Sequence, residues 1–228
     1  MSYIYETRTR EWIGYDIKSE AYRHLGIALM ISSITTFIML QLGIEIILPL
    51  YWFGSFGEFI IIMILFFGML FRSEFSESTA TILLYAFAVC SSITLSLIVY
   101  IALALDPAIV VGAVGTTTVV AFFAYLFSGH TYKRISQISR IVLIMVIAFF
   151  ILALFGFFMF SANPAFYLLI SLISAVIFSI YMFIDFARLE NRAFSSPAMM
   201  ALWLFYDIIF LLKQLLMIFI YLGVGDRD

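Results

Sequence analysis

Charge is what this sequence lacks most. Only 11% of its 228 residues are Asp, Glu, Lys or Arg, whereas about a quarter of the residues are charged in an average soluble domain. Hydrophobic side chains make up 65% of the chain, and the mean hydropathy is +1.15. These values exclude a water-soluble globule. They predict an all-α integral membrane protein that has the lipid bilayer as its surroundings.

Residues that build common sites are also scarce. The single cysteine, Cys90, excludes an intrachain disulfide. The only histidines are His24 and His130, and there is no HExxH or CxxC motif, so no zinc site is recognisable. A net charge of -2 gives no basic surface for nucleic acid. We therefore expect neither a resident cofactor nor a nucleic-acid partner.

Long apolar stretches dominate what is there. A helix needs about 20 apolar residues to cross a bilayer, and seven stretches approach or exceed this length: Leu25–Gly43, Phe56–Phe71, Ala80–Leu105, Ala108–Phe127, Ile141–Phe160, Ala165–Phe186 and Ala198–Leu222. They predict one seven-helix membrane domain over residues 25–222, with an N-terminal segment (1–24) and a short tail (223–228). Prolines at 49, 107 and 164 are each expected to open a new helix, where the missing N–H costs little.

The positive charges predict the topology. Short cytoplasmic loops carry an excess of Lys and Arg, and ten such residues fall on one side of the predicted spans: Arg8, Arg10, Lys18, Arg23, Arg72, Lys133, Arg134, Arg140, Arg188 and Arg192. The N-terminus is therefore predicted to be cytoplasmic. The membrane would be the plasma membrane in a prokaryote, or that of the endoplasmic reticulum or Golgi in a eukaryote. A seventh full span would put the C-terminus outside, whereas a re-entrant one would return it to the cytoplasm.

Four ionisable residues lie within the predicted spans: Glu58, Asp185, Asp207 and Lys213. Each costs at least about 2.5 kcal/mol in hydrocarbon and so needs a partner, water or a function. Spans six and seven are joined by a short loop, so Asp185 and Asp207 can approach each other. Two close carboxylates cannot both ionise cheaply, which predicts a proton-responsive switch or a cation site.

The basic residues near these acids are candidate partners. Lys213 does not share a helix face with Asp207, so it is expected to pair with another acid. The candidate is Glu58, the only other carboxylate predicted in the outer half of the membrane. Arg72 ends the second span at the level expected for Asp185. Static salt bridges that only lock the helices together are the alternative to a functional role for all of these residues.

Three stretches of this sequence are similar to one known family. Residues 106–126 begin Asp-Pro-Ala-Ile and continue as an Ala/Gly/Thr-rich helix, residues 178–190 contain Ser-x-Tyr-x-x-x-Asp185, and residues 207–218 follow the pattern Asp-x-x-x-x-x-Lys-x-Leu-Leu. In this combination the chain resembles the Bax inhibitor-1 family, also called the transmembrane Bax inhibitor motif family.

The resemblance implies a fold, an activity and a set of residues. The fold would be a seven-helix bundle with the last helix at its centre. The activity would be a pH-sensitive calcium leak, so that calcium and protons are the expected ions. Asp185 and Asp207 would sense protons and bind calcium, and an arginine near the end of helix two, here Arg72, would latch onto the helix-six aspartate.

Other function classes remain to be weighed. A proton-coupled transporter of small solutes would use the same buried acids. A non-conducting regulator of cell death or stress would bind other membrane proteins, although the chain ends without the lysine-rich tail of many eukaryotic members. An enzyme is not expected. Asp207 and Asp226 imitate an intramembrane protease motif, but 19 residues of one helix would hold them about 28 Å apart.

Overall fold

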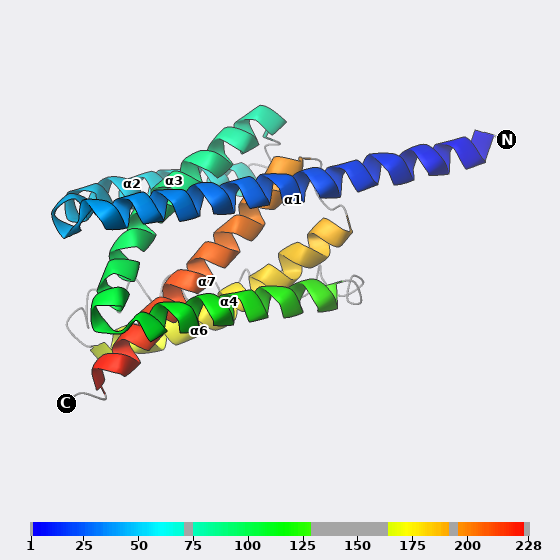
Figure 1. Cartoon of the computed structure of the whole chain (residues 1–228). Helices are drawn as coiled ribbons and strands as arrows, with labels where there is room; N and C mark the ends of the chain where they lie inside the picture. The colour runs from blue at the N-terminus through cyan, green and yellow to red at the C-terminus, as the bar shows by residue number, and fades with distance from the viewer. Residues whose placement is uncertain (1, 71–74, 129–163, 192–195, 226–228) are drawn as a thin grey trace. The chain divides into compact units, whose positions relative to one another are not determined.

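Every regular element in the described part of the chain is an α-helix (Figure 1). The computed structural model describes residues 2–70, 75–128, 164–191 and 196–225. The helices within these ranges are α1 (Ser2–Leu42), α2 (Ile44–Leu70), α3 (Glu77–Leu105), α4 (Pro107–Ser128), α6 (Pro164–Glu190) and α7 (Pro197–Gly225). The predicted span Ile141–Phe160 lies outside the described residues.

Each of these helices can cross a membrane. Among the described residues, six helices are long and apolar enough, with spans of 22 to 29 residues. The prediction of an all-α integral membrane protein is thus confirmed, and the count of seven spans stays a prediction. Helix α7 runs without a break from Pro197 to Gly225, which is long enough for a full span, and whether it crosses or re-enters stays a prediction.

Two of the three predicted proline boundaries are confirmed. Helix α4 begins at Pro107, and Asp106 caps it, because the backbone N–H of Ala108 donates to the Asp106 side chain at 2.8 Å. Helix α6 begins at Pro164. In both cases proline occupies the first helical position, where no intrahelical hydrogen bond is lost.

The prediction that Pro49 opens a helix is wrong. Pro49 lies inside α2, which begins twelve residues before the predicted Phe56. The break is at Gly43, whose φ of 81° ends α1 in the left-handed conformation that glycine adopts readily. The Gly43 carbonyl then accepts the N–H groups of Ile46 and Ile47 and so starts α2. Pro49, five residues into the new helix, removes one hydrogen bond only.

The polar N-terminal segment is part of the first helix. Helix α1 continues from Ser2 through residue 24 to Leu42 without interruption, and its membrane-spanning portion is Ile17–Leu42. The predicted N-terminal segment, residues 1–24, is thus continuous in backbone with the first span. The backbone keeps one helical path here, because residues 2–24 contain no proline. Their one glycine, Gly14, does not interrupt the helix.

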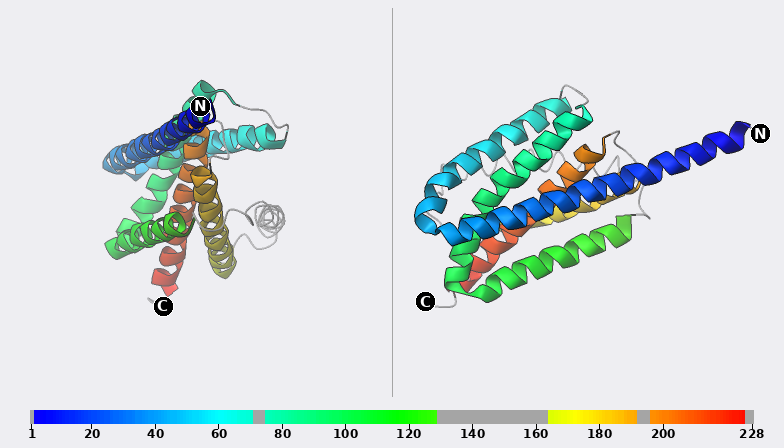
Figure 2. Two further views of the ribbon diagram at one scale, coloured as in Figure 1. Left: turned by 90° about the vertical axis from the view of Figure 1, so that its right-hand side faces the viewer. Right: turned by 45° about the horizontal axis from the view of Figure 1, so that its top comes forward.

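The chain divides into two compact units. Unit 1 comprises residues 1–96 and 188–205, and unit 2 comprises residues 97–187 and 206–228. In unit 1, α2 folds back beside α1 after Gly43 (Figures 1 and 2). Helices α2 and α3 approach closely at two glycines: a Cβ added at Gly57 would lie 2.6 Å from the sulfur of Cys90, and one at Gly54 would lie 3.0 Å from the Cys90 carbonyl oxygen.

Unit 2 is packed through aromatic side chains. Helices α6 and α7 are antiparallel, since Tyr167 stacks on Tyr221 while Phe178, further along α6, contacts Phe210, which comes earlier in α7. Helix α4 also packs on α7, where the Phe219 ring lies 3.4 Å from the position of a Cβ on Gly112.

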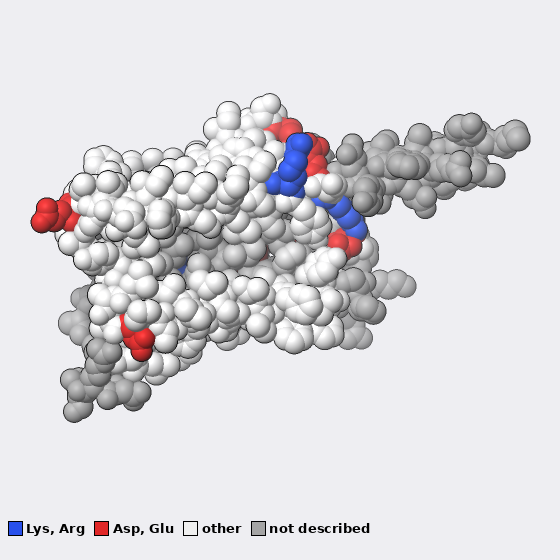
Figure 3. Space-filling model, viewed as in Figure 1, with Lys and Arg blue, Asp and Glu red and all other residues white. Residues whose placement is uncertain are grey.

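Charged side chains avoid the middle of the exposed helix surfaces. Figure 3 shows a face that is almost free of charged atoms except for small groups near its margins. The exposed charged residues Arg23, Glu45 and Asp106 lie near the ends of spans. The ionisable residues deep within spans are buried instead, namely Glu58, Asp185, Asp207 and Lys213. This distribution fits helices that present apolar side chains to lipid.

Candidate functional site

The two predicted sensor residues are buried in the same unit. Asp185 lies in the last two turns of α6 and is 5% exposed, and Asp207 lies in α7 and is 2% exposed. Both belong to unit 2. Buried carboxylates are rare unless a partner or a function retains them.

The packing of α6 on α7 gives the relative height of the two aspartates. Tyr167 is level with Tyr221, and Phe178 is level with both Tyr206 and Phe210, with ring centroids 6.4, 5.7 and 5.1 Å apart. With a rise of 1.5 Å per residue in antiparallel helices, this register puts the two aspartates roughly 6–12 Å apart along the helix axis. They therefore lie within about two turns of each other on neighbouring helices.

The structure places Lys213 and Glu58, two of the three residues predicted to form salt bridges in the membrane, but not Arg72. Lys213 is 7% exposed, and its ammonium nitrogen lies 5.2 Å from the centroid of the Phe210 ring, a cation–π contact within one helix. Glu58 is 8% exposed on α2, in unit 1, so its pairing with Lys213 of unit 2 stays a prediction. Arg72, the predicted latch, lies outside the described residues.

The chemistry that the carboxylates of Asp185 and Asp207 offer is the uptake of a proton or the binding of a hard cation. Within the described ranges no group of three or more His, Cys, Asp or Glu residues is placed to hold a metal ion. A pair of carboxylates supplies oxygen ligands, which calcium prefers, but too few to make a closed site by itself. Such a pair can take up a proton or bind a passing cation.

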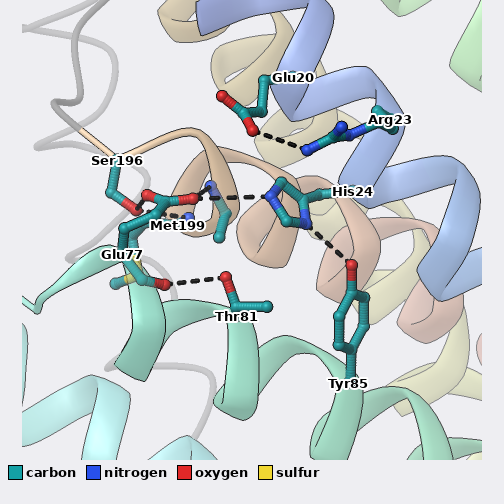
Figure 4. Close-up of polar contacts among 9 residues, drawn as sticks. Glu20, Arg23, His24, Glu77, Thr81, Tyr85, Ser196 and Met199 are labelled. Atoms are coloured by element: carbon teal, nitrogen blue, oxygen red, sulfur yellow. Dashed lines mark hydrogen bonds and ion pairs between the residues drawn. The ribbon is translucent and has the colours of Figure 1, made fainter.

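A second polar cluster, which the sequence analysis does not predict, lies in unit 1. We call it the Glu77 cluster; it consists of His24 from α1, Glu77 and Tyr85 from α3, and Ser196 before α7 (Figure 4). The Ser196 hydroxyl donates to the Glu77 carboxylate at 2.5 Å, and the backbone N–H of Ala198 donates to the other carboxylate oxygen at 3.0 Å. Nδ1 of His24 is 2.9 Å from the Tyr85 hydroxyl, and its Nε2 is 3.6 Å from Glu77.

Local sequence explains how Glu77 and Ser196 come to stand at helix starts. Ser76 caps α3, because its hydroxyl accepts the N–H of Thr79 at 3.2 Å, so that Glu77 occupies the first helical position. Ser196 caps α7 in the same way through the N–H of Met199 at 3.1 Å, and Pro197 follows at the first position. These two serine caps are the signal in the sequence, although they do not reveal that Glu77 reaches from one helix start to the other.

One comparison with known proteins identifies a family. A family model described as "Inhibitor of apoptosis-promoting Bax1" matches residues 17–223. The match begins at the first residue of the membrane-spanning part of α1 and ends at the last residue of that part of α7. No curated protein matched the chain.

Proposed function

The chain belongs to the Bax inhibitor-1 family, and from this premise we propose that it is a pH-sensitive calcium leak controlled by Asp185 and Asp207. The proposal assigns proton sensing and transient calcium binding to the two carboxylates. Family membership by itself supports a membrane protein of this type. Calcium conduction and its control by pH are what we propose in addition.

The observation that carries the proposal is the burial of two carboxylates on neighbouring helices. Asp185 and Asp207 are 5% and 2% exposed, and the aromatic contacts between α6 and α7 bring their levels within about two turns. A group in low dielectric resists ionisation, and a nearby like charge adds to this resistance. Protons bound by these carboxylates would therefore come and go as the pH changes.

The sign of the pH effect on calcium binding follows from charge. Deprotonation makes the pair more negative and strengthens its attraction for a divalent cation. Acidification neutralises the pair and weakens calcium binding. Conduction has a second, opposing contribution, because a neutral Asp185 would also release Arg72 if that arginine is the latch.

The orientation in the membrane is part of the same proposal. We place the N-terminus in the cytoplasm, because Lys18, Arg23 and Arg188, near the ends of their spans, and the cations of the loops are predicted on one side of the membrane. The buried pair would then lie in the cytoplasmic half of the bilayer. The membrane is that of the cell surface in a prokaryote, or that of the endoplasmic reticulum or Golgi in a eukaryote.

Calcium flux through the purified protein tests the proposal directly. Protein reconstituted in liposomes with a trapped calcium indicator should pass Ca²⁺ at a rate that changes between about pH 6 and 8, and Asp207→Asn and Asp185→Asn should each flatten that profile. Asp106→Asn is the matched control. Asp106 is exposed and caps α4, and asparagine caps equally well, so its profile should stay that of the wild type.

The same experiment separates the other function classes. No flux at any pH, with the protein folded, would contradict the leak and favour a non-conducting regulator of other membrane proteins. Flux of Ca²⁺ with an unchanged pH profile in both aspartate variants would reject the paired sensor. Proton movement that needs an added small solute would instead indicate a proton-coupled transporter.

A further inference from the structure

The first turn of α7 has one backbone amide that its own helix cannot satisfy. Pro197 has no N–H, the Met199 N–H donates to the Ser196 hydroxyl, and the Met200 N–H donates to the Ser196 carbonyl at 3.2 Å. Only Ala198 remains in this turn. Ala198 is completely buried, and a buried N–H without an acceptor costs about 1–3 kcal/mol.

Glu77 supplies the acceptor from another helix. Its carboxylate takes the Ala198 N–H at 3.0 Å and the Ser196 hydroxyl at 2.5 Å. Glu77 is itself in the first turn of α3, so one negative charge stands at two helix N-termini. Both termini carry partial positive charge, which favours a carboxylate there.

His24 adds a third helix and a proton-dependent charge. Its ring is 8% exposed, with Nδ1 2.9 Å from the Tyr85 hydroxyl and Nε2 3.6 Å from the Glu77 carboxylate. A neutral imidazole carries a hydrogen on one nitrogen only, whereas an imidazolium carries one on each. In the charged form His24 can donate to Tyr85 and face Glu77 as a cation at the same time.

We propose that Glu77 is a positioning residue that holds the first turn of α7, and that protonation of His24 tightens this hold. The sign follows from the charges: an imidazolium attracts the carboxylate and a neutral imidazole does not, so the hold is stronger at the lower pH. The inference concerns the anchoring of α7 in unit 1 and does not depend on whether the chain conducts calcium.

The other charges around His24 leave this sign unchanged. On its own helix Arg23 pairs with Glu20 at 2.7 Å, and Lys18 pairs with Glu190 from the end of α6 at 2.6 Å. On α3 the facing titratable groups are Glu77 and Tyr85. Residues 196–205 at the start of α7 contain no charged side chain. Among the described residues, Glu77 is thus the carboxylate that faces the His24 ring.

Hydrogen exchange of the first turn of α7 is the local measurement. Amides of a peptide covering this turn are followed by mass spectrometry at pH 6 and pH 8, with the intrinsic exchange rates corrected. In the wild type, protection should be about twofold to fivefold higher at pH 6, as expected for a partly exposed ion pair. The first turn of α4, capped by Asp106, is the internal reference.

Four variants separate the hydrogen bond that Glu77 accepts from Ala198 from its charge interaction with His24. Glu77→Ala should lower protection of this turn about tenfold at both pH values, since Ala198 loses its acceptor. Glu77→Gln and His24→Gln should keep most of the protection and lose its pH dependence. Arg23→Gln, which removes a neighbouring cation with an exposed side chain, should keep both.

The outcomes are decisive in either direction. The proposal is supported if the pH dependence of protection is lost in Glu77→Gln and in His24→Gln and is retained in Arg23→Gln. A pH dependence that survives in His24→Gln overturns the role of the imidazole. Two results overturn the role of the carboxylate: Glu77→Gln with the wild-type difference in protection between pH 6 and pH 8, or a folded Glu77→Ala protein with wild-type protection.

Discussion

The two units of this protein each have a characteristic helix contact, although unit 1 also contains the edge-on pair Phe87 and Phe205 at 6.0 Å. In unit 1 the helices meet at small residues and short hydrogen bonds: Gly57 lies against Cys90, and the hydroxyls of Ser92 and Ser32 are 2.7 Å apart. In unit 2, aromatic rings of α6 and α7 pack on one another, such as Phe178 and Phe210 at 5.1 Å. Close backbone approach and hydrogen bonds permit little change in geometry, whereas aromatic pairs are favourable over centroid distances of about 4.5–7 Å.

This difference bears on where a conformational switch can be placed. Three of the four buried ionisable side chains predicted to be functional, Asp185, Asp207 and Lys213, belong to unit 2. Their helices pack through contacts that tolerate small shifts. We therefore expect unit 1 to respond to added or lost atoms as a tightly fitted structure, and unit 2 to respond mainly through its charged side chains.

The largest effect is expected at the closest helix contact of unit 1. Gly57→Ala would place a Cβ 2.6 Å from the Cys90 sulfur, so either this sulfur or the two helices must move. Overpacking of this kind costs about 1–3 kcal/mol. The free energy of unfolding, measured by SDS titration in bicelles, should fall by this amount.

Two further variants decide whether the sulfur is the cause. Gly115→Ala on α4 of unit 2 has nothing within 4 Å of the new Cβ and should be neutral or stabilising by up to about 1 kcal/mol, because alanine favours helix. Adding Cys90→Ala to Gly57→Ala should restore most of the lost stability. If Gly57→Ala is as harmless as Gly115→Ala, the tight fit assigned to unit 1 is wrong.

An intermediate effect is expected where a buried cation meets an aromatic ring in unit 2. A double-mutant cycle of Lys213→Met and Phe210→Leu should give a coupling of about 0.5–2 kcal/mol, because the Lys213 ammonium lies 5.2 Å from the Phe210 ring. The same cycle with Phe219→Leu is the control, since that ring packs at Gly112. Equal couplings in both cycles would mean that the contact contributes nothing specific.

The sequence predicts the helix ends better than it predicts the contacts between helices. Asp106-Pro107 and Pro164 mark helix starts because capping and proline geometry act within one turn. Pro49 misleads for the same local reason: a proline near a helix start is tolerated, and the actual break depends on Gly43 with its positive φ.

The polar contacts illustrate the other half of this comparison. Asp185 and Asp207 stand out in the sequence because an acid in an apolar run is unexpected whatever it touches. Glu77 does not stand out, because it follows a serine at a helix start, where acids are common. Its contact with Ser196 joins residues 119 positions apart, and only the packing of the helices brings them together.

The smallest effect is expected at the serine contact between α1 and α3. Ser32 and Ser92 are 3% and 0% exposed, and a 2.7 Å hydrogen bond joins their hydroxyls. Hydrogen bonds between membrane helices contribute about 0.6 kcal/mol on average, so Ser32→Ala should lower the free energy of unfolding by about that amount. The adjacent Ser33 is the matched control, because it is exposed and its hydroxyl donates within α1 to the Leu29 carbonyl. Ser33→Ala should therefore change stability by less than Ser32→Ala. Equal effects of the two substitutions would show that the hydroxyl contact between the helices adds nothing beyond ordinary helix propensity.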